Sequence, residues 1–164
     1  MDNPGAKNER RDLMILLRNR RRRFRRRIRY YSSFIFSTNV FVGLLTANYV
    51  YCVLFATLFL TSLRVHSLQV NSNNYIAINL LGKLVIFLIF LYGGHRLLQK
   101  RYMTPWGITK AIIIAMTCLF VIWIYCYGYL TNDLCFHHVP EFAAIYHVFM
   151  HVVGSLGHSM IMVF

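Results

Sequence analysis

ITKAIIIAMTCLFVIWIYCYGYL, residues 108–130, is an almost unbroken apolar run of membrane length. A helix that crosses the hydrocarbon core of a bilayer needs about 20 mainly apolar residues. Three further windows meet this requirement, at residues 34–63, 75–98 and 142–164. Of the 164 residues, 57% are hydrophobic and only 14% are charged, which excludes an ordinary soluble domain. The sequence therefore predicts an all-α polytopic membrane protein with four transmembrane helices.

The segment before the first predicted span is rich in arginine. It holds eleven of the fourteen arginines, all between residues 10 and 29, and Leu13, Leu17 and Phe24 are interspersed among them. This pattern is typical of a basic amphipathic helix on a membrane surface. We therefore divide the chain into an Arg-rich cytoplasmic segment, residues 1–31, and a four-helix transmembrane domain, residues 32–164.

These arginines are expected to bind anionic lipid headgroups on the cytoplasmic side. Each basic residue near an anionic surface contributes about 1 kcal/mol to membrane attraction. Nucleic acid is the less favoured partner, because lipid anchoring and control of topology account for the run without it. A retention signal for internal membranes is a further interpretation of the same run. The residues expected to bind headgroups are Arg20, Arg21, Arg22, Arg23, Arg25, Arg26, Arg27 and Arg29.

Basic residues beside the spans also predict the orientation. Under the positive-inside rule, connections rich in lysine and arginine face the cytoplasm. The arginine run and the connection between Arg96 and Lys110 are both basic, whereas residues 131–141 contain no lysine or arginine. We therefore expect both termini in the cytoplasm and residues 131–141 in the lumen or exterior. An endomembrane, ER or Golgi, is favoured over the plasma membrane.

The last predicted span carries a stripe of histidines. His147 and His151 are four residues apart and share a helix face, and His158 returns to nearly the same face. Ionisable residues at membrane depth are energetically expensive and mark functional sites. The second predicted span contains Lys83, which either snorkels to the headgroups or pairs with a carboxylate such as Asp133 or Glu141.

Three interpretations of the histidine stripe stay open. In the first, the histidines form hydrogen bonds with neighbouring helices or buried water. In the second, His147 and His151 bind zinc together with a third ligand, either His66 or Asp133, and the zinc supplies a hydroxide that attacks an amide or ester. In the third, a haem or quinone is shared with another subunit, because histidines suitable as a second axial ligand are missing from the other spans.

The residues Asn132-Asp133-Leu-Cys135, followed by His147-x-x-x-His151 and Gly154-Ser-Leu-Gly157, resemble the end of the CREST superfamily. That superfamily includes alkaline ceramidases and the progestin and adipoQ receptors, which have seven helices. The resemblance covers about residues 108–164 and implies that His147 and His151 bind a zinc ion used to hydrolyse a lipid amide. It also implies structural roles for Asp133 and Cys135. The zinc histidine, serine and aspartate of the family's early helices have no counterpart in the first predicted span.

Taken together, these features favour a small multi-pass subunit or scaffold of a membrane complex. The chain is short and almost entirely embedded, half of the zinc site is missing, and Cys135 has no partner cysteine on its predicted side. Lipids and other membrane protein subunits are the expected partners. The alternatives are a zinc-dependent lipid amide hydrolase of alkaline ceramidase type with a reduced helix set, and a haem- or quinone-associated anchor subunit.

Overall fold

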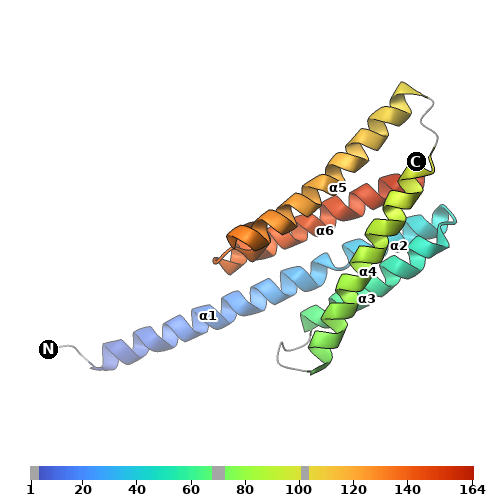
Figure 1. Cartoon of the computed structure of the whole chain (residues 1–164). Coiled ribbons are helices and arrows are strands. Elements are labelled where there is room, and N and C mark those ends of the chain that lie inside the picture. Colours follow the sequence, from blue (N-terminus) through green and yellow to red (C-terminus); the bar gives the residue numbers. More distant parts are fainter. Residues whose placement is uncertain (1–3, 68–72, 101–103) are drawn as a thin grey trace.

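The computed structural model describes residues 4–67, 73–100 and 104–164, without the side chains of residues 4–8, 10, 22 and 73. These residues confirm the all-α fold (Figure 1). The helices follow one another along the chain and are joined by short connections. They are α1 (Pro4–Ser32), α2 (Ile35–Leu45), α3 (Tyr49–Ser67), α4 (Asn73–Leu98), α5 (Pro105–Thr131), the short 3₁₀ helix η1 (Leu134–Phe136) and α6 (Pro140–Val163).

Three of the described helices are long and apolar enough to cross a membrane: Tyr49–Ser67, Asn74–Leu98 and Pro105–Thr131. They make the chain a candidate multi-pass integral membrane protein. The predicted fourth span is helical as α6, but it does not reach the same apolarity. Three histidines and several serines and glycines lower its hydropathy. The prediction of four spans is therefore confirmed only in part.

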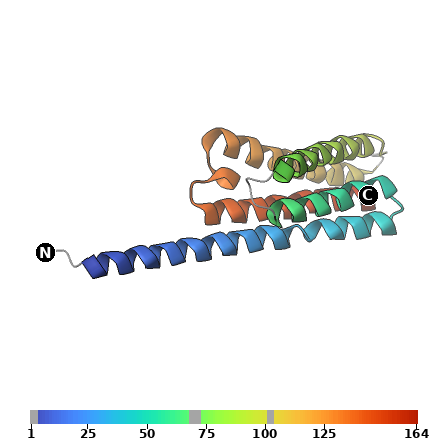
Figure 2. The same ribbon diagram turned by 90° about the horizontal axis from the view of Figure 1, so that it is seen from below.

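The prediction of one span over residues 34–63 is wrong, because the chain reverses at Thr46–Asn48. Ala47 adopts a left-handed backbone conformation (φ 54°), which ends α2. The Asn48 amide donates to Gly43 O at 2.8 Å, and the Asn48 side chain donates to Thr46 Oγ1 at 2.8 Å. These bonds satisfy polar groups at the turn, so α2 and α3 pack as an antiparallel hairpin (Figure 2).

The Arg-rich helix α1 does not lie across the end of the bundle, as a surface helix would. It passes into α2 almost in line, with only Ser33 and Phe34 between them, and projects from the bundle along the bundle's own direction (Figure 2). The physical reason is that the junction is fixed on two sides. Ser32 is hydrogen-bonded to α6 and Ser33 to α3.

The hairpin also changes which connections share an end of the bundle. Arg21 Nε lies 3.9 Å from Glu141 Oε1, so the arginines lie beside residues 131–141 and not at the opposite end. The ammonium groups of Lys100 and Lys110 instead lie over the ring of Phe164. The Arg-rich run and Phe164 thus lie at opposite ends of the bundle (Figure 2), and the predicted orientation across the membrane, with both termini in the cytoplasm, stays a prediction. Arg101 lies outside the described residues.

The core of the bundle is centred on α3. Tyr51 and Phe55 are fully buried there and pack with Val85 and Ile89 of α4 and Ile161 of α6. Figure 1 shows α3 and α4 side by side, with α5 covering α6 on the other side. The core therefore brings the histidine face of α6 against α1, α2 and α3.

Candidate functional site

His66, His147 and His151 form a histidine cluster between α3 and α6. The ring centroids of His66 and His147 are 5.5 Å apart, and those of His147 and His151 are 4.5 Å apart. The predicted partner His66 thus comes from a different helix and packs edge-on against His147. The ring of His151 also lies 4.6 Å from the ring of Phe36. The rings that were expected together from the sequence are neighbours in the fold.

A pair of serines that the sequence analysis missed anchors this cluster. Ser32 and Ser33, at the junction of α1 and α2, are both buried. Ser32 Oγ lies 3.1 Å from His151 Nδ1, and Ser33 Oγ lies 2.8 Å from Ser62 Oγ of α3. Both serine hydroxyls donate to the carbonyl oxygen of Arg29, at 2.8 Å and 3.2 Å. The junction therefore joins three helices through side-chain hydrogen bonds.

These bonds are compatible with a His151 tautomer that carries its proton on Nδ1. A hydroxyl has one proton, and Ser32 donates it to the Arg29 carbonyl. In the tautomer in which His151 Nδ1 donates to Ser32 Oγ, a lone pair is left on His151 Nε2. A histidine that binds a metal usually donates its other ring N–H in this way.

Two buried nitrogen atoms at the histidine cluster have no hydrogen-bond partner among the described residues. One is His147 Nε2, and the other is Nε of the neighbouring Arg29. The Arg29 guanidinium lies close enough to act electrostatically on both His66 and His147. A buried polar atom without a partner costs about 1–3 kcal/mol. The histidine cluster is therefore a polar centre whose hydrogen bonds are incomplete. A ligand or water bound there would gain binding free energy by supplying the missing hydrogen bonds.

The donor set is chemically suited to zinc, but its nitrogens do not converge. Within residues 4–67, 73–100 and 104–164, no group of three or more His, Cys, Asp or Glu side chains could hold a metal ion as it stands. The nearby charge of Arg29 also opposes a cation. Asp133, the alternative third ligand, instead accepts from the Leu134 amide at 2.7 Å and lies 3.7 Å from His137 Nε2. The zinc site remains a prediction.

The connection after α5 has a local structural role. Asn132 adopts a left-handed conformation (φ 54°) and ends α5, and Asp133 caps η1. His137 Nδ1 accepts from the Val139 amide at 2.8 Å, and its ring stacks on that of His138. Cys135 is a free, half-buried thiol, and burial raises its pKa to about 11. These contacts shape the turn between α5 and α6.

His158 belongs to a second polar centre, deeper along α6. Its Nδ1 lies 3.2 Å from the Tyr51 hydroxyl, and its ring packs against the rings of Tyr51 and Phe55. Gly93 of α4 makes room for this ring, since a methyl group there would come within 2.7 Å of His158 Cε1. His158 therefore has a packing and hydrogen-bonding role, separate from the histidine cluster.

Asn39 adds a third interhelical contact. Its side chain is completely buried, donates to Ser155 Oγ at 2.7 Å and accepts from Ser159 Oγ. The sequence analysis did not connect these residues. Ser155 and Ser159 are four residues apart in α6 and therefore share one face of that helix. This spacing is the signal that could have indicated a polar partner on another helix.

Lys83 is exposed and forms no ion pair with any described residue. The predicted pairing with Asp133 or Glu141 is wrong, because Asp133 lies beside His137 and Glu141 beside Arg21. Asp133 caps η1 and Glu141 lies in the first turn of α6, and the Lys83 side chain is exposed.

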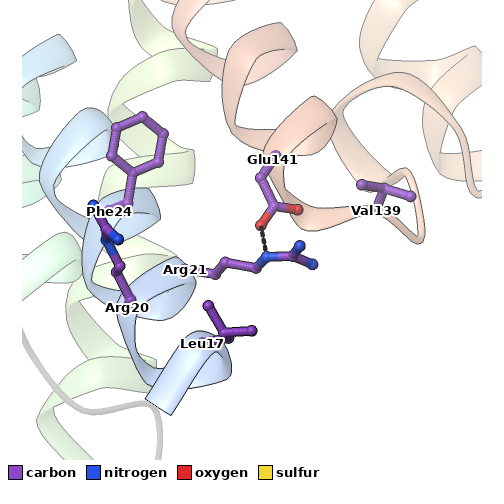
Figure 3. A pocket seen from close by; sticks show the side chains of 6 residues that line it. All are labelled: Leu17, Arg20, Arg21, Phe24, Val139 and Glu141. Atoms are coloured by element: carbon purple, nitrogen blue, oxygen red, sulfur yellow. Dashed lines mark ion pairs between the residues drawn. The ribbon is translucent and has the colours of Figure 1, made fainter. Parts of the chain in front are cut away.

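Most of the predicted headgroup-binding arginines are exposed along α1. Arg25 and Arg29 are half-buried, and the side chain of Arg22 lies outside the described residues. A cavity of about 510 Å³ separates α1 from the start of α6 (Figure 3). Its walls combine cationic, acidic and apolar side chains: Leu17, Arg20, Arg21, Phe24, Val139 and Glu141.

A smaller cavity of about 170 Å³ adjoins the histidine cluster. It is lined by Arg26, Arg27, Tyr30, Tyr31 and His66. Comparison of the chain with protein-family models, with curated proteins and with solved structures found no match.

Proposed function

We propose that this multi-pass membrane protein serves as a subunit or scaffold of a membrane complex. One observation carries the proposal: the N-terminal part of α1 extends beyond the bundle and leaves large apolar side chains exposed among its arginines (Figure 1). Leu13 and Leu16 are 57% and 62% exposed. Because these side chains contribute little to the folded bundle, their free energy of burial is available for an external surface.

The N-terminal part of α1, which we call the arm, has a composition that suits a membrane surface with a partner protein nearby. Arginines attract anionic headgroups, and the interspersed leucines can enter the interface. Within the described residues, the arm's ion pair with the bundle is that of Arg21 with Glu141, at 3.9 Å and largely exposed to solvent. Such a pair is worth less than about 1 kcal/mol. The arm is therefore free to bind elsewhere.

The interior supports a scaffold role as well. Most of its buried polar groups form hydrogen bonds between helices, such as Asn39 with Ser155 and Tyr51 with His158. Hydrogen bonds of this kind fix the positions of helices in a membrane. They leave the apolar outer faces of α4 and α5 for lipid or for other subunits.

We infer an orientation from the same arrangement. The arginine run carries most of the positive charge, so its end of the bundle should face the cytoplasm. Residues 131–141, which include Cys135, then face the cytoplasm as well, and Phe164 lies on the opposite side. A free Cys135 thiol fits a reducing compartment.

Mild solubilisation of native membranes tests the scaffold proposal. The full chain should migrate in an assembly heavier than a homo-oligomer, and other membrane proteins should be present in constant proportion. Replacing Leu13 and Leu16 by aspartate should weaken this assembly, whereas replacing the exposed Asn19 by aspartate, which adds charge at a polar position, should not. A chain that is monomeric under these conditions and correctly folded would refute the proposal.

A zinc-dependent lipid hydrolase is the second candidate, and it rests on the histidine cluster. Among the residues that the structure describes, His147 Nε2 is buried without a hydrogen-bond partner, and its ring lies beside those of His66 and His151. The rings would have to rotate for their nitrogens to meet at about 2.1 Å from one ion. One zinc per chain is expected in this case, lost in His147→Ala and kept in His158→Ala. Absence of bound zinc in wild-type protein supplied with zinc would reject the hydrolase, and an absorption scan tests the haem interpretation.

A further inference from the structure

Lys83 occupies an unusual position, close to the middle of the apolar candidate span in α4. The candidate span Asn74–Leu98 is 25 residues long, and its midpoint is Ile86. Lys83 is three residues from this midpoint, which corresponds to about 4.5 Å along the helix axis. Its side chain is exposed on the outside of the bundle.

The bundle side of α4 is marked by Val85 and Ile89, which are 4% and 3% exposed. At about 100° per residue, Lys83 lies roughly 160° around the helix from Val85 and 120° from Ile89. The ammonium group is therefore directed away from α3 and α6. Among the described residues, no carboxylate forms an ion pair with Lys83.

Reaching the headgroups would be difficult from this depth. The hydrocarbon core is about 30 Å thick, so its boundary lies about 15 Å from the midpoint. A lysine side chain extends about 6 Å, and snorkelling from Lys83 would still leave the ammonium several ångströms inside the apolar layer. A charge held there is expensive unless an opposite charge or a hydrogen-bond acceptor accompanies it.

The residues around Lys83 form a helix-packing stripe. Ile76, Leu80, Lys83 and Phe87 alternate at spacings of four and three residues, and Gly94 continues the stripe. This alternation is that of a helix–helix seam. The three apolar members are 67%, 67% and 58% exposed, and no atom lies within 4 Å of the position that a methyl group on Gly94 would occupy. A small residue at such a position lets a second helix approach closely.

We propose that this stripe binds a transmembrane helix of a partner subunit that carries an aspartate or glutamate at mid-membrane depth, paired with Lys83. The proposal rests on the proposed role as a complex subunit and specifies the chemistry of the partner. A carboxylate both neutralises the ammonium and accepts its hydrogen bonds, and the apolar members of the stripe pack around the pair.

Defined peptides in vesicles test this pairing without a natural partner. The full chain is reconstituted in phosphatidylcholine with a polyleucine transmembrane peptide that carries one central glutamate, and association is followed by energy transfer. The same peptide with glutamine serves as the comparison. Wild-type chain should bind the glutamate peptide about tenfold more tightly, because a buried interhelical polar contact contributes on this scale.

Three variants make the test specific. Lys83→Met should lose the preference for glutamate, whereas Lys100→Met, which removes a cation beyond the end of α4, should keep it. Lys83→Glu should reverse the preference towards a lysine peptide. Circular dichroism of each variant verifies that the helices are intact.

The outcomes separate this inference from the scaffold proposal. Equal binding of both peptides by wild type, or an unchanged preference in Lys83→Met, refutes the pairing. Retention of an anionic lipid that depends on Lys83, without peptide preference, also refutes it and assigns the ammonium to headgroups. If the native assembly persists in Lys83→Met while no peptide preference exists, only this inference fails. If wild type prefers glutamate but is monomeric in native membranes, the scaffold proposal fails instead.

Discussion

Replacing Gly93 by alanine should destabilise the bundle, whereas the same change at Gly94 should not. Both glycines lie near the end of α4, one residue apart, so the helical propensities of the two sites are comparable. Their surroundings are opposite. A methyl group on Gly93 would lie 2.7 Å from His158 Cε1 and 3.0 Å from the Tyr51 hydroxyl, but a methyl group on Gly94 has no atom within 4 Å.

The magnitude follows from the groups that must move. The His158 ring is held between Tyr51 and Phe55, so it cannot turn aside freely. Overpacking of this kind costs about 1–3 kcal/mol. Displacing the ring also weakens its hydrogen bond to Tyr51, which contributes about 0.6 kcal/mol between helices in a membrane. An opposing contribution comes from helix propensity, because alanine stabilises a helix by about 1 kcal/mol relative to glycine.

Gly93→Ala should therefore lower the free energy of unfolding by about 1–2 kcal/mol. Gly94→Ala should raise it by up to about 1 kcal/mol. The assay is unfolding in mixed micelles with an increasing fraction of SDS, followed by the helical circular dichroism signal. The double variant Gly93→Ala, His158→Ala removes the 2.7 Å clash and leaves the 3.0 Å contact with the Tyr51 hydroxyl, so the alanine at position 93 should cost clearly less in that background. Equal effects at the two glycines, or no coupling to His158, would refute the packing described for α3, α4 and α6.

Three more predictions concern other parts of the chain. Asn39→Ala should lower the free energy of unfolding by about 1–3 kcal/mol in the same assay, because two interhelical hydrogen bonds and buried volume are lost; the exposed Thr38→Ala is its control. In a variant that keeps only Cys135, alkylation of the folded chain should still accelerate between pH 9 and 10, because only the thiolate reacts and burial raises the pKa of this thiol to about 11; a plateau near pH 9 would contradict the burial. Arg23→Gln and Arg26→Gln should each weaken binding to anionic vesicles about fivefold, with smaller losses at high salt, and binding that ignores both charge and salt would contradict headgroup contact.

The positions of the later helices could be predicted closely from the sequence. The windows 75–98, 108–130 and 142–164 agree with α4, α5 and α6 to within a few residues. Long apolar runs are strong signals because they need no knowledge of their neighbours, and Pro105 and Pro140 mark where two of these helices begin.

The helix hairpin could not be predicted in the same way. The turn uses two polar side chains, Thr46 and Asn48, around an alanine in a left-handed conformation. Alanine carries no turn signal, and both polar residues are also tolerated inside membrane helices. Because this turn was not expected, the sequence did not predict that residues 131–141 would lie at the same end of the bundle as the arginines.

At the candidate site, too, one residue could be predicted from the sequence and another could not. His66 was one of two candidate third ligands, beside Asp133, because it was predicted on the same side of the membrane as the start of the histidine stripe, and its ring does lie beside that of His147. Ser32 was missed because its contact with His151 joins residues 119 positions apart. Spacing within one helix predicts which residues share a face, but it contains no information about which distant residue that face will meet.

The polar groups along α6 differ in how completely they are hydrogen-bonded, and this difference indicates which of them has a function beyond holding the helices together. Asn39 and His158 both have partners on neighbouring helices, so they are explained by the stability of the bundle. At the histidine cluster, Arg29 Nε and His147 Nε2 are buried without a partner in the described part of the chain. Evolution for stability alone would replace such groups by apolar ones, since a buried polar atom without a partner only costs free energy. Identifying what meets Arg29 Nε and His147 Nε2 in the membrane is therefore a direct test between the two proposals: a zinc ion would support the hydrolase, and a partner side chain the scaffold.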